Sequence, residues 1–126
     1  MGASRDQSRI GYHVYHLDQP RDCGEILEWN DFGVLDAGRS YCIEGHIRLN
    51  DPGRSNGVLD GWVDGQPAFA RNDFRFREND TIGVDDFWLN IYSGRKQPSR
   101  EDLHLRVDEV VISDHGPDRL PGCVRR

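Results

Sequence analysis

Short runs of alternating apolar and polar residues dominate this chain, and they predict strands rather than helices. The clearest run covers residues 41–50, in which Ile43 and Ile47 fall on one side and Glu44 and His46 on the other. Because successive side chains of a strand point to opposite faces, this spacing predicts a half-buried strand. Comparable runs predict further strands at residues 9–17, 24–30, 58–63, 66–71, 86–93 and 103–113.

Turn-forming residues separate these runs. Asp64-Gly65 lies between two predicted strands and favours a type I′ hairpin turn, which needs positive φ at both central residues. Residues 50–53 predict a loop, since Pro52 has no backbone N–H and Gly53 tolerates positive φ. Short strands separated by turns predict an all-β fold, an antiparallel β-sandwich at residues 9–114 with a disordered lead at 1–8 and an irregular tail at 115–126.

Composition and charge exclude some partners. The 126-residue chain has a formal net charge of −6, which argues against a nucleic-acid partner because such binding needs a basic surface. An anionic ligand is compatible with this charge, since all but one of the 16 basic residues are Arg, which suits bidentate carboxylate binding. Codon bias in a GC-rich genome would produce the same excess of Arg.

Metal sites, cofactors and membrane spans have no clear sequence signal. The three cysteines form no C-x-x-C pair, and Asp85 and Asp86 lack the spacing of a calcium-binding loop, so we expect no metal and no cofactor. No apolar run is as long as a membrane span, and residues 1–8 contain no apolar leader. We therefore expect no membrane partner and a soluble, cytoplasmic protein, or a secreted one if a leader has been removed.

The polar sides of the predicted strands would form a second surface if the apolar sides form the core. Aromatic rings on such a surface can stack on sugars, and Asn, Asp and Arg can bond sugar hydroxyls. A simpler interpretation is that the Trp side chains pack between sheets and that the His side chains are solvated. The substrate-binding candidates are Arg48, Asp60, Trp62, Trp88, Asn90, Tyr92 and Arg106.

Residues 12–16 contain the best catalytic candidates, because His and Tyr side chains can take and give protons. His13 and Tyr15 lie two positions apart and so share a strand face. β-Elimination of a polyuronate needs a base for the C5 proton, an acid for the leaving oxygen and a group that neutralises the C6 carboxylate. Tyr15, His13 and His46 are the candidates for catalysis, although strand propensity alone would also explain residues 12–16.

Several segments also occur in a characteristic order. They are YHVYHLDQP (12–20), EILEWN (25–30), YCIEGHIRLNDPGRSNGVLDGWVDG (41–65), FRFR (74–77), VDDFWLNIYSG (84–94) and VDEVVISD (107–114). Together they resemble the alginate and glucuronan lyase-like polysaccharide lyases over residues 10–114. The resemblance implies a concanavalin-like jelly roll that holds an acidic polysaccharide or oligosaccharide on its concave sheet. It places the family's catalytic tyrosine at Tyr15 and puts His13 where the family has another tyrosine.

Length separates this chain from that family, whose members are roughly twice as long. The chain resembles only the second half of such a sandwich, which would leave open sheet edges and an uncovered apolar face. We therefore expect a truncated sandwich that is completed in a homodimer, although the strands could instead close a smaller sandwich. Three functions stay open: a carbohydrate-binding protein that has lost catalysis, an active small polyuronate lyase, and a non-catalytic oligomeric assembly module.

Overall fold

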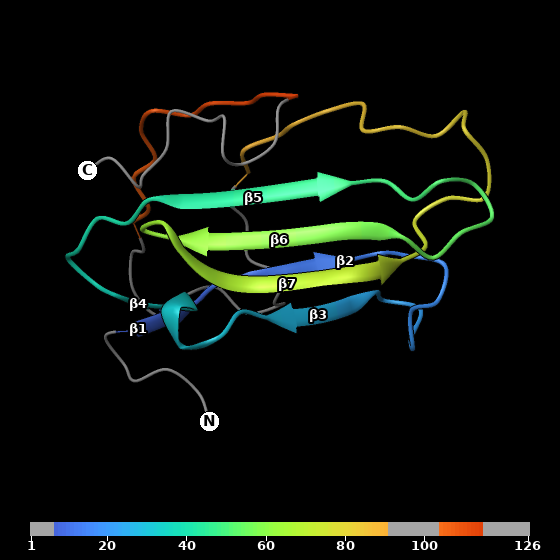
Figure 1. Ribbon diagram of the computed structural model, residues 1–126. Helices are drawn as coiled ribbons and strands as arrows, with labels where there is room; N and C mark the ends of the chain where they lie inside the picture. The colour runs from blue at the N-terminus through green and yellow to red at the C-terminus, as the bar shows by residue number, and fades with distance from the viewer. Residues whose placement is uncertain (1–6, 91–103, 115–126) are drawn as a thin grey trace.

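The computed structural model describes residues 7–90 and 104–114, and this part of the chain is built from antiparallel β-strands (Figure 1). The elements are β1 (Gln7–Arg9), β2 (Gly11–Val14), β3 (Glu25–Glu28), the 3-10 turn η1 (Asp31–Gly33), β4 (Val34–Asp36), β5 (Ile43–Arg48), β6 (Gly57–Val63) and β7 (Gln66–Phe74). No helix in these residues is both long and apolar enough to span a membrane. The predicted all-β, antiparallel fold class is confirmed.

Strands β5, β6 and β7 form the larger sheet, in which neighbouring strands are antiparallel. The β6–β7 hairpin turns at Asp64 and Gly65, whose φ angles are 49° and 79°. Positive φ at both positions is what a type I′ turn requires, so the predicted hairpin is confirmed. β7 continues past its predicted end and pairs Phe74 with Gly57.

A smaller layer lies behind this sheet in Figure 1. It is the antiparallel pair β2–β3, in which Tyr12 lies opposite Leu27 and His13 opposite Ile26. Tyr12 and Leu27 are half-buried, whereas His13 and Ile26 are exposed. The hairpin therefore turns one face toward the larger sheet and the other toward solvent. β1 and β4 form a separate antiparallel pair.

The two layers meet in a small apolar core. The buried ring of Trp29 lies directly over Gly61 of β6, where a side chain would occupy the same space. Tyr12 packs edge-on against Trp29 and Phe69, with ring centroids 5.4 Å and 5.7 Å apart. Two antiparallel layers with apolar side chains between them are consistent with a β-sandwich.

One buried side chain ties the loop after β5 to the chain after β7. Asn50 is completely buried. Its amide nitrogen donates to the carbonyl oxygens of Asp51 and Arg77, at 3.1 Å and 3.0 Å. Its oxygen accepts from the backbone N–H groups of Phe76 and Arg77, at 2.7 Å and 3.1 Å. The predicted loop is thus a structural joint between two strand ends.

Two of the predicted strands do not form in the described residues. Residues 86–90 and 104–113 are exposed and belong to no strand, while residues 91–93 and 103 lie outside the described residues. In the second of these segments the chain leaves extended geometry at Glu109, where φ is 52°. Alternation shows which side of a segment can be buried, but a strand also needs a hydrogen-bonded neighbour.

Strands β1 and β4 were not predicted from the sequence, since three-residue strands are too short to show alternation. Gln7 and Ser8, which were expected in a disordered lead, pair with Asp36 and Leu35. Residues 1–6 and the tail at 115–126 lie outside the described residues.

Candidate functional site

The largest group of predicted binding residues lies on the face of the larger sheet that points away from β2 and β3. We call it the outer face and define it by Glu44, His46, Asp60 and Trp62. In the β5–β6 register, Glu44 lies opposite Trp62 and His46 lies opposite Asp60. Because strand side chains alternate, all four project on the side opposite to the core residues of β6.

Two hydrogen-bonding side chains form a pair at the centre of this face. His46 Nδ1 lies 3.0 Å from Asp60 Oδ2, and the two side chains are 28% and 24% exposed. A histidine whose Nδ1–H is held by a carboxylate has Nε2 as its acceptor nitrogen. The pair therefore offers an oriented imidazole and a carboxylate to a ligand that lies over the sheet.

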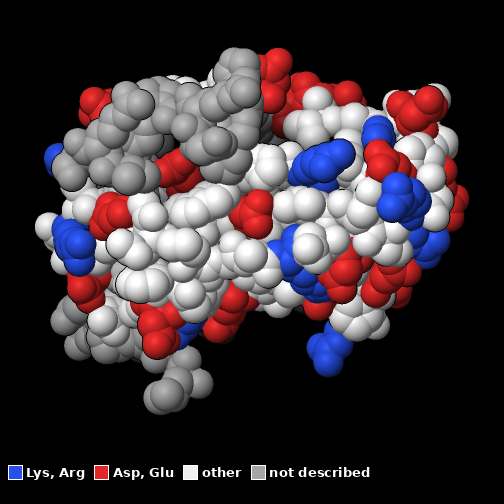
Figure 2. Space-filling view, viewed as in Figure 1, with Lys and Arg blue, Asp and Glu red and all other residues white. Residues whose placement is uncertain are grey.

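Trp62 and Arg48 complete the chemistry of the outer face. Trp62 is half-buried beside the pair, and Arg48 is exposed at the end of β5. Figure 2 views the molecule from this side, and most of the Lys and Arg atoms there lie toward the end at which β5 and β7 terminate. An aromatic ring, a carboxylate, an imidazole and a cation thus come from two adjacent strands.

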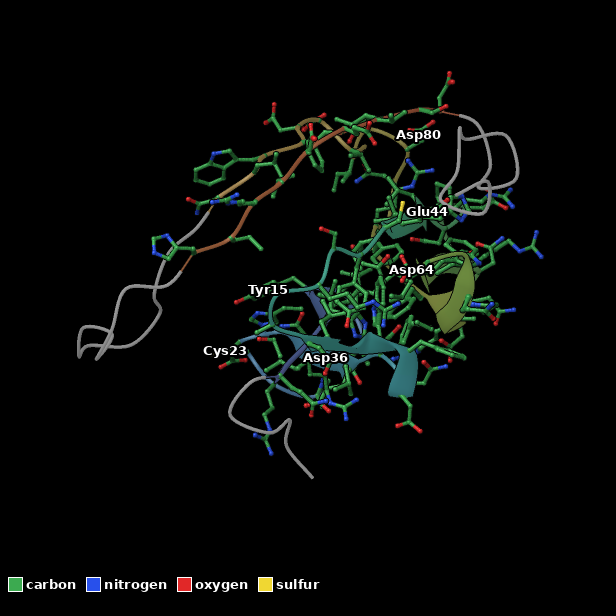
Figure 3. All side chains as sticks on the ribbon, turned by 90° about the vertical axis from the view of Figure 1, so that its left-hand side faces the viewer. Tyr15, Cys23, Asp36, Glu44, Asp64 and Asp80 are labelled. Atoms are coloured by element: carbon green, nitrogen blue, oxygen red, sulfur yellow. The ribbon has the colours of Figure 1, made fainter. Side chains whose placement is uncertain are left out.

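His13 and Tyr15 lie on the opposite side of the molecule. Their rings are 5.4 Å apart, as their shared strand face predicts, and Tyr15 is 62% exposed. His13 Nε2 lies 2.5 Å from the carbonyl oxygen of Cys23, to which it donates a hydrogen bond. Figure 3 shows Tyr15 and Cys23 on the β2–β3 side, away from Asp64 of the larger sheet. The structure therefore brings two catalytic candidates together and separates both from His46.

The remaining predicted binding residues are not on the packed strands. Trp88, Asn90 and Arg106 are exposed in the two segments that belong to no strand, and Tyr92 lies outside the described residues. These segments extend away from the packed strands at the top of Figure 3. Of the predicted binding residues that the structure describes, it gathers only Arg48, Asp60 and Trp62.

Tyr12 links the outer face to the core. Its ring lies between the layers, and its hydroxyl donates to the carbonyl oxygen of Asp60 at 2.5 Å. Burial raises the pKa of Tyr12 to about 12, although a hydrogen bond with the backbone of His46 opposes this shift. Tyr12 is therefore neutral at physiological pH and positions the backbone on which Asp60 and His46 stand.

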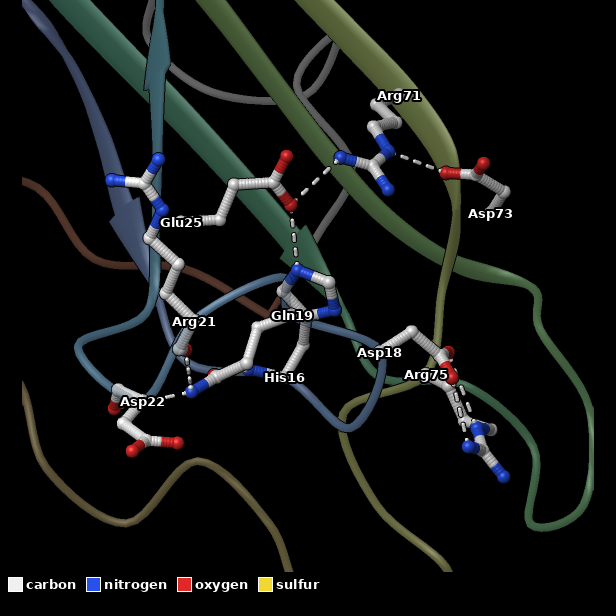
Figure 4. Close-up of polar contacts among 9 residues, drawn as sticks. All are labelled: His16, Asp18, Gln19, Arg21, Asp22, Glu25, Arg71, Asp73 and Arg75. Carbon is white, nitrogen blue, oxygen red and sulfur yellow. Dashed lines mark hydrogen bonds and ion pairs between the residues drawn. The ribbon is translucent and has the colours of Figure 1, made fainter.

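A partly buried ionic cluster around His16 was not predicted from the sequence (Figure 4). His16 Nε2 donates to Glu25 Oε1 at 2.7 Å, and Arg71 Nη1 lies 3.3 Å from the same oxygen. Arg71 also bonds Asp73 at 2.6 Å, and its guanidinium lies 4.2 Å from the centre of the Phe74 ring. The inward position of Glu25 in the predicted strand 24–30 was the signal that could have revealed it.

This cluster has a structural role. The side chain of His16 is 1% exposed, so it cannot meet a ligand from solvent. The hydrogen bond from His16 lowers the pKa of Glu25, partial burial opposes that shift, and Arg71 lowers the pKa further. The cluster therefore fastens the chain after β2 to β3 and β7 through charge-assisted hydrogen bonds.

The described residues show no group of three or more His, Cys, Asp or Glu side chains that could hold a metal ion. Cys42 is disulfide-bonded, and Cys23 is an exposed free thiol. Comparison with known proteins found no matching family model, no matching curated protein and no matching solved structure.

Proposed function

We propose that this protein binds carbohydrate on the outer face of its larger sheet and that its ligand is an acidic polysaccharide, a polyuronate. The observation that carries the proposal is the His46–Asp60 pair beside Trp62, on one accessible sheet surface. Sugar rings present C–H groups that stack on an indole, and their hydroxyls both donate and accept hydrogen bonds. This surface supplies partners for each of these groups.

The acidic nature of the ligand rests on Arg48 and on the sequence resemblance. Arg48 stands at the end of β5, where its guanidinium can form a fork with a uronate carboxylate. Glu44 and Asp60 are negative, so the carboxylate must lie over that end of the strand rather than over the pair. We also propose that the fold is a concanavalin-like jelly roll and that a second copy of the chain completes it.

Titration calorimetry with polyuronate oligosaccharides tests the location of binding. We expect Trp62→Ala to weaken binding about tenfold, a loss of about 1.4 kcal/mol. The matched control is Tyr15→Ala, which removes an exposed aromatic ring from the opposite side and should leave affinity unchanged. The reverse result, with loss in Tyr15→Ala alone, would move the site to the β2–β3 side and overturn the proposed surface.

Polyuronate lyase activity is the second candidate function, and one contact favours it. The neighbouring rings of His13 and Tyr15 could supply a base and an acid on the β2–β3 side. However, Arg48 lies on the other side of the molecule, so the group proposed to bind the carboxylate does not meet these proton-transfer groups. We therefore expect binding without β-elimination.

The absorbance of the unsaturated product decides between the two functions. Incubation of the protein with alginate or polyglucuronate should produce no rise in ultraviolet absorbance. A rise that Tyr15→Phe abolishes would establish the lyase and contradict the loss of catalysis.

A further inference from the structure

The two C-terminal segments that belong to no strand expose many large apolar side chains. Phe87, Trp88 and Leu89 are 58%, 78% and 57% exposed, and Leu105 is 67% exposed. Isolated exposed apolar residues are common on protein surfaces, but contiguous runs mark interaction sites. The exposed apolar residues of these segments are Phe87, Trp88, Leu89, Leu105, Val107, Val110, Val111 and Ile112.

The larger sheet has an apolar surface that is covered only in part. Ile43 and Ile47 of β5 pair with Val63 and Leu59 of β6, so all four point toward the core side of the sheet. Val63 and Leu59 are buried, yet Ile43 and Ile47 are still 41% and 46% exposed. The β2–β3 layer therefore covers β6 and leaves the core side of β5 partly open.

The larger sheet and the β2–β3 pair also have open edges, at β5 and at β2. Among the described residues, β5 pairs only with β6 and β2 pairs only with β3. A strand added beside β2 would lie over Ile43 and Ile47, because β2 already places Tyr12 against Gly45 of β5. The core side of β5 thus lacks cover, and two apolar segments of the described chain belong to no sheet.

We propose that residues 86–90 and 104–112 are the missing strands of the smaller layer and that they dock over Ile43 and Ile47 of a second copy of this chain. The exchange is reciprocal, so both copies gain the same cover and the dimer is closed. In the described structure the segments extend away from the packed strands rather than over their own β5 (Figure 3). A partner copy supplies the apolar surface that they lack.

A second copy fits this position because the apolar side chains that the segments expose match the apolar surface that β5 leaves uncovered. Both segments lie within strands that the sequence pattern predicts, and the uncovered surface is the flank of a sheet with an open edge. A second copy presents both features at once. The inference does not depend on sugar binding, because it uses the core side of β5 whereas the sugar site uses the outer face.

Sedimentation equilibrium of the full chain tests this inference. We expect a dimer that Ile47→Asp and Leu105→Asp each weaken at least tenfold. Leu105 is well exposed, so its replacement leaves the packed strands intact even if Ile47→Asp unfolds the sheet. The matched control is Ile26→Asp, which places the same charge on the exposed side of β3 and should leave the dimer unchanged.

Hydrogen exchange identifies where the segments dock. Amides of residues 104–112 should exchange more slowly as protein concentration rises. A chain that is monomeric at every concentration, or a dimer that Leu105→Asp leaves unchanged, would overturn the inference. Concentration-independent protection of residues 104–112 would also overturn it, since it would mean that the segments cover their own chain. Trp62→Ala should leave the dimer intact, so a failure of the proposed sugar site can be distinguished from a failure of the proposed dimer.

Discussion

Single residues hold this small fold together, and Asn50 is the clearest case. Its buried amide forms hydrogen bonds with backbone groups of residues that follow β7. It also bonds the carbonyl oxygen of Asp51, the next residue in the chain. We expect Asn50→Ala to lower the free energy of unfolding by about 3 kcal/mol, because buried backbone groups lose their partners. Urea unfolding measures this change.

The control for that prediction is Asn72→Ala, since Asn72 is exposed on β7. It should change the free energy of unfolding by less than about 0.5 kcal/mol. Equal effects of the two substitutions would show that Asn50 does not act as a joint.

Glu25 gives stability a defined dependence on pH. Its pKa in the folded protein lies below the ordinary value of 4.5, because His16 and Arg71 bond the ionised carboxylate. A lowered folded-state pKa stabilises the protein fully above the unfolded-state pKa, and this stabilisation is lost as the pH falls through the lower value. The cluster therefore weakens in acid, below about pH 4.5.

Urea unfolding measured across the acid range tests this dependence. Glu25→Gln should reduce stability at neutral pH and flatten its decline in acid. Glu28→Gln, on the exposed side of the same strand, should keep the wild-type slope. A slope that Glu25→Gln leaves unchanged would exclude Glu25 as the group responsible.

In the candidate site, the sequence predicted which residues share one face of a strand but not which residues of neighbouring strands meet. The alternation of residues 41–50 correctly put Glu44 and His46 on one side. The sequence could not show that His46 pairs with Asp60, because this depends on the register of β5 against β6. It also gave no reason to separate His46 from Tyr15, since which layer a strand joins is decided by packing.

At the scale of elements, the contact between the layers depends on a glycine in β6. A Cβ at Gly61 would overlap the ring of Trp29, which is backed by the buried core. We expect Gly61→Ala to destabilise the protein by about 2 kcal/mol through overpacking and to shift Trp29 fluorescence.

Gly83→Ala is the matched control for that prediction. A Cβ at Gly83 meets no atom within 4 Å, and its φ is not in the positive range. This substitution should leave stability and fluorescence unchanged. A stable Gly61→Ala variant with unaltered fluorescence would contradict the placement of Trp29 between the layers.

Elements with local signals were predicted best. The hairpin at residues 58–71 was readable because Asp64-Gly65 encodes its turn and flanking residues alternate. The strands expected at 86–93 and 103–113 were also predicted from their sequence pattern, but no hydrogen-bonded neighbour exists for them in the described chain. Pairing across a sheet is non-local, so a pattern alone identifies candidates for pairing rather than strands.

At the scale of the whole molecule, three surfaces have separate roles in this account. We propose that the outer face of the larger sheet binds sugar and that the core side of β5 receives a second copy, while the β2–β3 side carries the His13–Tyr15 contact. The net charge of −6 makes binding of an acidic ligand sensitive to salt. We expect affinity for polyuronate to rise as ionic strength rises from a low value, because screening weakens overall repulsion while the local contacts persist.

Calorimetry over a salt series measures that dependence. Affinity that falls steeply and continuously with salt would instead indicate that Arg–carboxylate attraction dominates binding. A neutral oligosaccharide of equal length is the control, and its affinity should vary little with salt.

The most direct test of the central claim is a nuclear magnetic resonance titration of the isotope-labelled protein with a polyuronate oligosaccharide. We predict that the largest shift changes occur at the Trp62 indole, at His46 and along β5 and β6, while His13 and Tyr15 are unaffected. Changes centred on His13 and Tyr15, or no changes at any ligand concentration, would contradict a sugar site on the outer face.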